Sequence, residues 1–437
     1  MTVRREAADA GMGGLLDELR WRGMLHDATP GLAARLASGR PIRVYNGFDP
    51  TAPSLHIGNL VPIFGLLHIQ RAGGTPVAVV GGATGMIGDP SGRSAERVLL
   101  DRTTIAANAT AIHGQLARFL DFSPGLANGA LMVDNADWLA PLGLLDFLRD
   151  VGKHFTVPYM LGKDSVQLRL DRGLSFTEFS YMLLQAYDFL HLYRALGVEG
   201  QAGGADQWGN ITAGLELIRR VEGSGAAGEE LAHGLAYPLL TNESGAKFGK
   251  SEAGENVWLS AELTSPYRFY QYWLNADDRD VGRYLRFFTL FPAERIAELE
   301  ADLAAHPEAR AAQRALAHDV TARVHGEAEA ALQDRVSLAA FSREPVTDPE
   351  VLEVLHGAVD SFDFGASELS LDALGLAVAS GLYASKAEAR RAIAQGAYSI
   401  NGARVAAAED PLPEPVAGRY LVLRSGRRTV RIGRRRD

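Results

Sequence analysis

The stretch from Tyr45 to Asn59 is the part of the sequence that most restricts the fold. It follows Pro41 to Val44, which predicts a strand, and it leads into Leu60 to Gln70, whose apolar spacing predicts a helix. In open α/β sheets, ligands bind at the carboxyl ends of strands, and a helix start offers free backbone N–H groups and a positive dipole end. We therefore expect Asn46 to Asn59 to bind a nucleotide triphosphate, with Tyr45 facing a second substrate.

The same order of strand, glycine-rich turn and helix recurs along the chain. The expected elements are strands at 75–80 and 131–133, helices at 13–25, 31–38, 138–150, 176–195 and 211–221, and glycine-rich turns at 81–92 and 201–210. This βαβ order predicts an α/β fold with a Rossmann-like parallel sheet that helices cover on both faces.

After this region the sequence changes character. Residues 264–340 have helical patterns rich in Ala, Glu and Arg, with breaks near Asn275, Pro292 and Pro307. Near the end, helices are predicted at 371–379 and 385–394, with β-type segments around 398–400, 420–423 and 429–432, and Asn401-Gly402 is a hairpin signal. The expected domains are a catalytic domain over 1–262, an α-helical domain over 263–350, a linker over 351–370 and an α+β domain over 371–437.

Charge is distributed unevenly. From Lys386 to Asp437 there are 12 Lys/Arg and 5 Asp/Glu, so this segment has a net charge of +7. Because the whole chain has a net charge of −9, the remaining residues have a net charge of −16. A basic terminal unit on an acidic body indicates contact with a polyanion, although a solvated basic tail has the same composition.

Composition also restricts the compartment and the chemistry. There is no cysteine, which excludes disulfides, thiolate metal sites and a cysteine nucleophile. No signal peptide is evident, and no apolar run approaches the roughly 20 residues that span a bilayer. We expect a cytoplasmic protein that does not associate with membranes.

Two lysines flank a glycine in Lys247-Phe248-Gly249-Lys250-Ser251, a pattern suited to closing over phosphate oxygens. A phosphate-binding P-loop is the alternative, because Gly249-Lys250-Ser251 matches its end. The glycine that a P-loop requires five positions before Gly249 is Ser244, and no buried strand precedes it. The loop at 81–92 likewise lacks the Gly-x-Gly-x-x-Gly spacing of a dinucleotide site. We assign no metal site and no Ser/His/Asp triad.

Tyr181, Gln185 and Asp188 are spaced four and three residues apart, so they share one face of a predicted helix. By themselves they fit an ordinary polar face equally well. His56-Ile57-Gly58-Asn59, taken alone, also fits a helix start with a buried histidine.

Read together, these motifs resemble the bacterial tyrosyl-tRNA synthetases, a family of class I aminoacyl-tRNA synthetases. His56–Asn59 and Lys247–Ser251 are similar to the two signatures of that class. The more specific segments are 45–51, 80–92, 176–181, 185–188 and 203–211. The similarity runs from about residue 13 to the C-terminus, where residues 371–437 are similar to the family's S4-type RNA-binding domain.

Carried over position by position, the resemblance implies roles for individual residues. Those expected at the phosphates and in catalysis are Thr51, His56, Asn59, Arg93, Arg97, Lys247, Lys250 and Ser251. Those expected to bind tyrosine are Tyr45 and Asp188 at the phenol hydroxyl, Asp89, Tyr181 and Gln185 at the α-ammonium, and Gln207 near the carboxylate. Those expected to bind ATP are Gly47, Asp49, His56, Gly58, Asn59, Gly204, Asp206, Lys247, Phe248 and Lys250. Those expected to contact RNA are Arg424, Arg427, Arg428 and Arg431. A solvated helix face remains the alternative for Arg93 and Arg97.

Two positions depart from the family pattern. Asn59 stands where the family usually has a second histidine, and Asn46 stands where it often has a cysteine. An asparagine side chain can still donate to a ribose oxygen, so these departures put nucleotide affinity in doubt but not the reaction.

The resemblance implies the activation of tyrosine with Mg-ATP to tyrosyl-adenylate and pyrophosphate, followed by transfer to the 3′-terminal adenosine of tRNA(Tyr). It implies a homodimer joined through 138–176, with Phe176 as an apolar anchor, although a core position for Phe176 stays open. No tightly bound cofactor and no DNA are expected. Two alternatives remain, namely a tryptophanyl-tRNA synthetase and a non-enzymatic RNA-binding or splicing protein built on a synthetase body.

Overall fold

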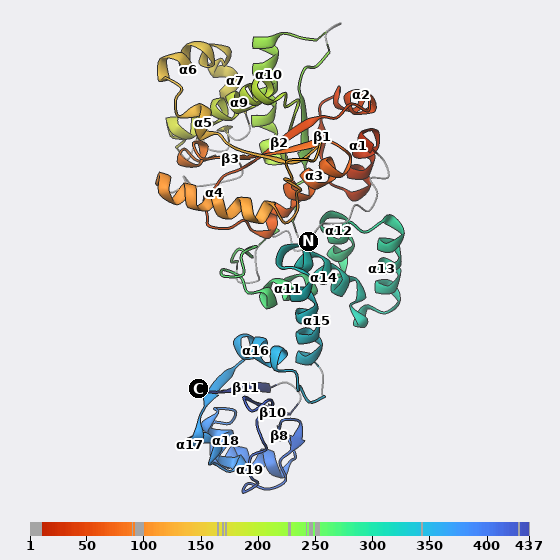
Figure 1. Ribbon diagram of the computed structural model, residues 1–437, viewed down its shortest axis with the longest axis vertical. Helices are drawn as coiled ribbons and strands as arrows, with labels where there is room; N and C mark the ends of the chain where they lie inside the picture. Colours follow the sequence, from red (N-terminus) through yellow and green to blue (C-terminus); the bar gives the residue numbers. More distant parts are fainter. Residues whose placement is uncertain are drawn as a thin grey trace. The chain divides into compact units, whose positions relative to one another are not determined.

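The computed structural model describes residues 11–89, 91, 100–163, 166–167, 170, 173–225, 229–241, 243, 248–249, 254–341, 344–426 and 429–436. Packing divides the chain into two compact units (Figure 1). The first unit is Met1–Thr264 with Ala276–Ala312, and the second is Ser265–Asn275 with Gln313–Asp437. The domain boundaries expected from the sequence stay predictions. None of the described helices is long and apolar enough to cross a membrane.

A largely parallel sheet forms the centre of the first unit. Its strands are β1 Asp27–Ala28, β2 Arg43–Phe48, β3 Thr75–Val80, β4 Leu131–Asp134, β5 Gly200–Gly204 and β6 His233–Tyr237. Across the described residues they lie in the order β1-β6-β5-β2-β3-β4, and every neighbouring pair is parallel except β1 with β6. This arrangement confirms the expected α/β class.

Helices cover both faces of this sheet. The described α-helices that lie wholly in this unit are α1 Gly11–Arg22, α2 Leu32–Ala37, α3 Leu60–Arg71, α4 Arg102–Leu116, α5 Ala136–Leu139, α6 Leu144–Asp150, α7 Val157–Leu161, α9 Phe176–Leu196, α10 Trp208–Glu222, α12 Asp278–Phe288 and α13 Ala293–Ala305. Helix α3 packs on β2 and β3, while α9 and α10 lie over the opposite face (Figure 1). The apolar periodicity at 60–70 and 176–195 therefore predicted α3 and α9 correctly.

Strand β5 was not predicted. Its sequence, Gly200–Gly204, contains no β-branched or aromatic residue, and we expected most of it to lie in a glycine-rich turn. It is instead a central strand between β6 and β2. A Cβ on Gly200 would lie 2.9 Å from Val44 Cγ2, so close packing against β2 requires glycine at this position. Strand propensity reflects how well side chains pack on a sheet, and glycine has no side chain to pack. Residue preferences therefore do not predict a strand in such a segment.

Two helical regions are more divided than their patterns predicted. The pattern over 138–150 is split into α5 and α6, because Pro141 and Gly143 interrupt it. The long region at 264–340 breaks near Asn275, Pro292 and Pro307 as expected. It also breaks at Gly326, whose φ of +99° separates two helices in the second unit.

The second unit contains helices and a small sheet. Its described elements are α11 Pro266–Leu274, α14 Ala311–His325 (which begins in the first unit), α15 Glu327–Phe341, α16 Pro349–Ala358, β7 Ser361–Phe364, α17 Ala366–Leu369, α18 Ala373–Ala379, α19 Lys386–Ala394, β8 Tyr398–Ile400, β9 Ala403–Arg404, β10 Tyr420–Ser425 and β11 Thr429–Arg435. Five described strands lie in the order β7-β11-β10-β8-β9. The predicted hairpin at Asn401-Gly402 joins β8 and β9, with positive φ at both residues (49° and 83°).

Residues 351–370, expected as a linker, have regular structure. They contain most of α16, strand β7 and helix α17, and β7 pairs in parallel with β11. Phe364 is fully buried in the hydrophobic core of this part of the chain. The prolines just before this segment, with Asp360 and Gly365, suggested a linker. Phe364 instead belongs to the core that follows, and Leu352 and Leu355 pack in a second cluster that includes Val336 of the preceding helix.

Arg22, at the end of α1, is almost fully buried because it completes the end of another helix. Its guanidinium donates to the carbonyl oxygens of Arg286 and Thr289, both at 2.9 Å, and of Phe291 at 3.1 Å. These carbonyls lie at the C-terminal end of α12, where the last turn of a helix has no intrahelical donors. One buried side chain therefore satisfies three backbone acceptors that are distant in sequence.

We expect Arg22→Ala to lower the free energy of unfolding of the first unit by about 2–4 kcal/mol, because it leaves these buried acceptors unpaired. Urea denaturation of the two proteins measures the difference. Arg20→Ala is the matched control, because Arg20 and its partner Asp17 are both exposed, and we expect a change within about 0.5 kcal/mol. Equal losses in the two variants would contradict the capping role.

Candidate active site

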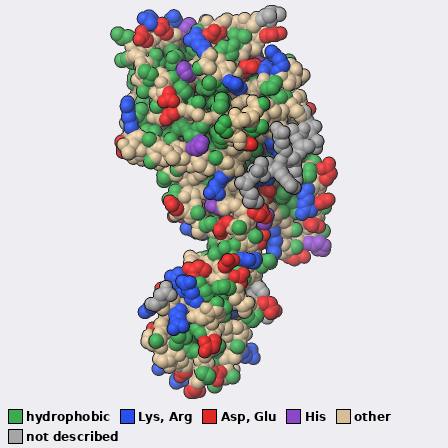
Figure 2. Space-filling model, viewed as in Figure 1, with side chains coloured by type: hydrophobic (Ala, Val, Ile, Leu, Met, Phe, Trp, Pro, Cys, Tyr) green, Lys and Arg blue, Asp and Glu red, His purple; other side chains and the backbone are tan. Residues whose placement is uncertain are grey.

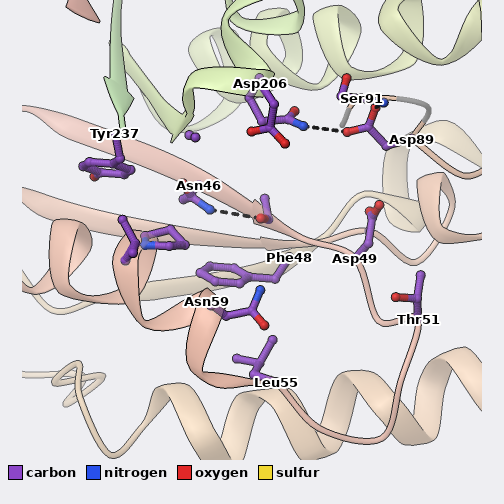
Figure 3. A pocket seen from close by; sticks show the side chains of 18 of the residues that line it. Asn46, Phe48, Asp49, Thr51, Leu55, Asn59, Asp89, Ser91, Asp206 and Tyr237 are labelled. Atoms are coloured by element: carbon purple, nitrogen blue, oxygen red, sulfur yellow. Dashed lines mark hydrogen bonds between the residues drawn. The ribbon is translucent and has the colours of Figure 1, made fainter. Parts of the chain in front are cut away.

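A cavity of about 980 Å³ opens at the carboxyl ends of the central strands of the first unit. Strand β2 lies between β3 and β5 there, which makes this the switch point where an open α/β sheet binds ligands. The volume is at the upper end of the range for small-molecule sites and suits two substrates at once. Figure 3 shows Asp49, Asp89 and Asp206 around one opening, each from the loop after a different strand.

The structure brings the described candidate residues of the first unit together. Those that line the cavity are Tyr45, Gly47, Asp49, Thr51, His56, Gly58, Asn59, Asp89, Tyr181, Gln185, Asp188, Gly204, Asp206, Gln207 and Phe248. Arg93, Arg97, Lys247, Lys250, Ser251, Arg427 and Arg428 lie outside the described residues. The roles of all these residues stay predictions.

One end of the cavity combines a tyrosine hydroxyl with a fixed carboxylate. Tyr45 and Asp188 are 2% and 3% exposed, and the Tyr45 hydroxyl has no hydrogen-bond partner among the described residues. Asp188 accepts from Asn135 Nδ2 at 2.9 Å and from Trp138 Nε1 at 2.7 Å. This end therefore offers an unused hydroxyl and a carboxylate held in one orientation, which together complement a phenol hydroxyl.

The two donors to Asp188 are themselves held in place. Asn135 accepts at its Oδ1 from the backbone N–H of Ala83 at 2.8 Å, so its amide nitrogen faces the carboxylate. The Trp138 ring stacks on His191, with centroids 4.6 Å apart and planes 13° from parallel. Neither residue belongs to a motif that predicted the site. Asn135 directly follows β4, and this place at a strand end is the signal that could have identified it.

Burial raises the pKa of Asp188 to about 7; the Asn135 and Trp138 hydrogen bonds oppose this shift, and the nearby charges of Asp49 and Asp134 add to it. Burial, together with the Asp188 charge, raises the pKa of the Tyr45 hydroxyl well above its ordinary value. Tyr45 is therefore a neutral donor near pH 7, while Asp188 titrates there when no ligand is bound.

The resemblance assigns Asp188 to the phenol of tyrosine, and with that role its titration predicts a pH dependence of tyrosine binding. The pKa is raised, so Asp188 is ionised above about pH 7 and protonated below it, and the ionised fraction falls about tenfold for each further pH unit. Only the ionised carboxylate can accept hydrogen bonds at both of its oxygens, because neither oxygen carries a proton. We therefore expect tyrosine affinity to fall as the pH is lowered from 8 to 6. Equilibrium dialysis measures this, and Asp188→Asn should remove the dependence. The same slope in both proteins would exclude Asp188 as its cause.

A second polar group lies on the wall formed by α9, α10 and the loop after β3. Gln207 Nε2 donates to Asp89 Oδ2 at 2.7 Å, and Gln185 Nε2 donates to Gln207 Oε1 at 3.3 Å. Asn210, for which the resemblance implied no role, donates to Gln185 Oε1 at 3.0 Å. These contacts hold the Asp89 carboxylate in one orientation at the cavity, and a carboxylate is the expected partner of an ammonium group. Tyr181 instead donates to Asp49 Oδ2 at 3.4 Å.

The turn at His56 is held by two side-chain contacts. His56 Nδ1 accepts from the backbone N–H of Gly58, and Asn59 Oδ1 accepts from the backbone N–H of His56, both at 3.0 Å. Asn59 therefore has a structural contact at its oxygen, while its amide nitrogen has no hydrogen-bond partner among the described residues and can donate toward a ligand. Phe248 has a different environment, because it is buried and stacks on Phe288 with centroids 5.1 Å apart. It is an apolar wall of the cavity and supplies no side-chain hydrogen bond.

The two described RNA candidates lie in the second unit. Arg424 is on β10 and Arg431 on β11, and burial lowers the pKa of Arg424. Arg431 Nη1 donates to the backbone carbonyl of Ser380. Arg431 therefore also has a structural role.

Family models match both parts of the chain. The model described as tRNA synthetases class I (W and Y) matches residues 37–342, and the model described as Tyrosine--tRNA ligase SYY-like C-terminal domain matches residues 353–431. Tyrosine–tRNA ligase of Anaeromyxobacter dehalogenans is 50% identical over 432 residues, covering 96% of this chain and 99% of that protein. The ligase of Geobacillus stearothermophilus is 48% identical over 418 residues, covering 95% and 98%.

Solved structures agree with these sequence matches. A C-terminally truncated mitochondrial tyrosyl-tRNA synthetase from Aspergillus nidulans has a TM-score of 0.66 at 29% identity, covering 78% of this chain and 95% of that chain. A tryptophanyl-tRNA synthetase from Encephalitozoon cuniculi has a TM-score of 0.53 at 14% identity, covering 74% and 91%, which shows a shared fold alone. The fold does not separate tyrosine from tryptophan, but the near full-length sequence matches do. The chain belongs to the class I tRNA synthetases and, within that class, to the tyrosine–tRNA ligases.

Proposed function

We propose that the Tyr45 and Asp188 end of the cavity binds the phenol hydroxyl of tyrosine and that the His56 turn binds ATP. The observation that carries this assignment is the buried Tyr45 hydroxyl without a described partner, near a carboxylate that two donors hold in place. A phenol hydroxyl can both accept from Tyr45 and donate to Asp188. Asp89, with Gln185 and Gln207, takes the α-ammonium, and Asp206 and Gly204 take the ribose side of ATP.

In the first step, an oxygen of the tyrosine carboxylate attacks the α-phosphorus of ATP. A C(=O)–O–P linkage forms, the bond to the β-phosphate oxygen breaks, and its electron pair leaves with pyrophosphate. The carboxylate is already ionised, so no general base is needed, and catalysis consists of positioning and stabilising charge on the phosphates. Thr51, His56, Lys247 and Lys250 supply donors, and Mg²⁺ enters with ATP as part of the substrate.

In the second step, a ribose hydroxyl of the 3′-terminal adenosine of tRNA attacks the adenylate carbonyl, and AMP leaves.

ATP–pyrophosphate exchange with each of the amino acids tests the assignment of the cavity. We expect exchange with tyrosine alone. Exchange driven by tryptophan, or none with any amino acid, would contradict the proposal and favour the two alternatives named from the sequence.

We also propose that the protein is a cytoplasmic homodimer. The support is a group of apolar side chains in or beside the expected interface segment, 49–80% exposed: Leu144, Leu145, Leu148, Val157 and Phe176. A soluble monomer rarely exposes such a group. Phe176, at 78% exposed, is not a core residue.

The dimer proposal predicts that Leu145→Asp with Phe176→Asp converts the protein to a monomer, because two charges would be buried at the interface. Light scattering should give twice 47.0 kDa for the unchanged protein and 47.0 kDa for the double variant. Leu338→Asp, an exposed apolar position on α15 in the second unit, is the control. A 47.0 kDa monomer before any substitution would refute the homodimer.

Arg424, Arg427, Arg428 and Arg431 are proposed to contact phosphates of tRNA(Tyr). On the face drawn in Figure 2, Lys and Arg side chains gather near the end of β11. Contacts of this kind make affinity fall with increasing salt. Removal of residues 371–437 should therefore abolish aminoacylation while adenylate formation continues.

A further inference from the structure

The segment after the lysine-containing loop pairs with the His56 turn through its backbone. Ile57 N donates to Val257 O at 2.9 Å, and Leu259 N donates to Leu55 O at 2.8 Å. His56 and Trp258 are the central pair of this short antiparallel bridge. Two stretches about 200 residues apart are thus held side by side at the mouth of the cavity, and both His56 and Trp258 line it.

The same pairing extends to the described glycine of the loop. Val257 N donates to Gly249 O at 3.2 Å, and a Cβ on Gly249 would lie 3.3 Å from the backbone nitrogen of Gly58. Gly249 also has a φ of +103°, which favours glycine. All these contacts are made by backbone atoms, so a change of the Trp258 side chain leaves them in place.

The Trp258 side chain contacts the His56 ring directly. The ring centroids are 6.0 Å apart and the planes meet at 71°, an edge-to-face arrangement. The backbone N–H of Trp258 donates to Thr264 Oγ1 at 3.0 Å, which holds the residue on the side away from His56. Since His56 Nδ1 accepts from Gly58, the neutral imidazole carries its proton on Nε2. The Gly58 contact determines the tautomer, and the indole restricts the rotation of the ring.

We propose that Trp258 is a positioning residue for adenylate formation, and that it acts by holding the His56 ring in the orientation in which Nε2–H donates to the phosphates. This rests on the proposed role of His56 at ATP. A donor is effective only when it is aligned with the charge that develops, and a displacement of about 1 Å at a reacting group costs about 10²-fold in rate. The tyrosine end of the cavity has its own supports and does not depend on this contact.

The first test is the rate of adenylate formation in single-turnover experiments at saturating tyrosine and ATP. We expect Trp258→Ala to lower this rate about 10- to 100-fold with tyrosine affinity unchanged. Trp258→Phe retains an aromatic edge and should recover most of the rate. Trp21→Ala, an exposed tryptophan on α1, is the control and should leave the rate unchanged.

A double-mutant cycle with His56→Ala separates positioning from direct contact with a substrate. If Trp258 acts through His56, then Trp258→Ala costs less than about threefold once the histidine is absent. Losses that multiply in the double variant, or a Phe variant as slow as Ala, would overturn the proposal. Tyrosine binding by each variant shows that it is folded. If the unchanged protein lacks tyrosine-dependent exchange, the proposed function fails; if exchange is present and the cycle shows no coupling, only the role of Trp258 fails.

Discussion

Replacing Asp188 by alanine is expected to lower the preference for tyrosine over phenylalanine by about two to three orders of magnitude. The carboxylate is buried and oriented by Asn135 and Trp138, so phenylalanine leaves it and the Tyr45 hydroxyl without a ligand partner. Tyrosyl-tRNA synthetases are the established example of this effect, at about 10⁵-fold against phenylalanine, and that magnitude is taken from the family and not from this structure. The ratio of kcat/KM for the two amino acids in pyrophosphate exchange measures the change.

Asp137→Ala is the control for this prediction, because Asp137 is an exposed carboxylate two residues from Asn135 and outside the described lining of the cavity. We expect its preference to be unchanged. Asn135→Ala should lose part of the preference, since it frees the Asp188 carboxylate to change orientation. A preference that survives in Asp188→Ala would refute the assignment of this end of the cavity to the phenol.

Replacing Lys250 by alanine is expected to lower the rate of adenylate formation about 10²- to 10³-fold while tyrosine affinity is unchanged. The lysine charge is assigned to the leaving pyrophosphate, where charge increases during the reaction, and not to the amino acid. Lys250 follows Gly249, whose backbone is paired with Val257 beside the His56 turn. Pre-steady-state kinetics gives the rate, and equilibrium dialysis gives the tyrosine dissociation constant.

Lys386→Ala is the control for the charge change, because Lys386 is an exposed lysine on α19 in the second unit. We expect no effect of this substitution on adenylate formation. If Lys250→Ala weakened tyrosine binding as much as it slowed the reaction, the lysine would not be specific to the phosphates. The role given to the Lys247–Ser251 loop would then be wrong.

Much of the first unit could be predicted from short-range patterns. The run at 75–80 is strand β3 with the same limits, and the pattern at 176–195 ends within one residue of α9. The strand follows from a short continuous apolar run and the helix from a side-chain period of 3.6, and neither signal needs information from the rest of the chain. Strand β5 was not found because its glycines are required by close packing to its neighbours.

The candidate site shows the same division. Tyr45, Asp89 and Asp188 were selected by their motifs, and the structure places all three on one cavity. The motifs also selected Gln207, which donates to Asp89, but not the two donors that orient Asp188, because Asn135 and Trp138 lie 53 and 50 positions from it. A sequence motif records which residue is present, but not which distant donor satisfies it.

The sequence by itself determined the α/β class, the order of most elements, the family and the chemical type of each candidate ligand-binding residue. It did so because these properties depend on local periodicity and on motifs of adjacent residues. The tertiary structure alone decided that the Asp188 carboxylate is held by two donors, that Arg22 completes the end of α12 and that Trp258 contacts His56. Each of these contacts joins segments that are distant in the chain, and only the packing of the whole unit brings them together.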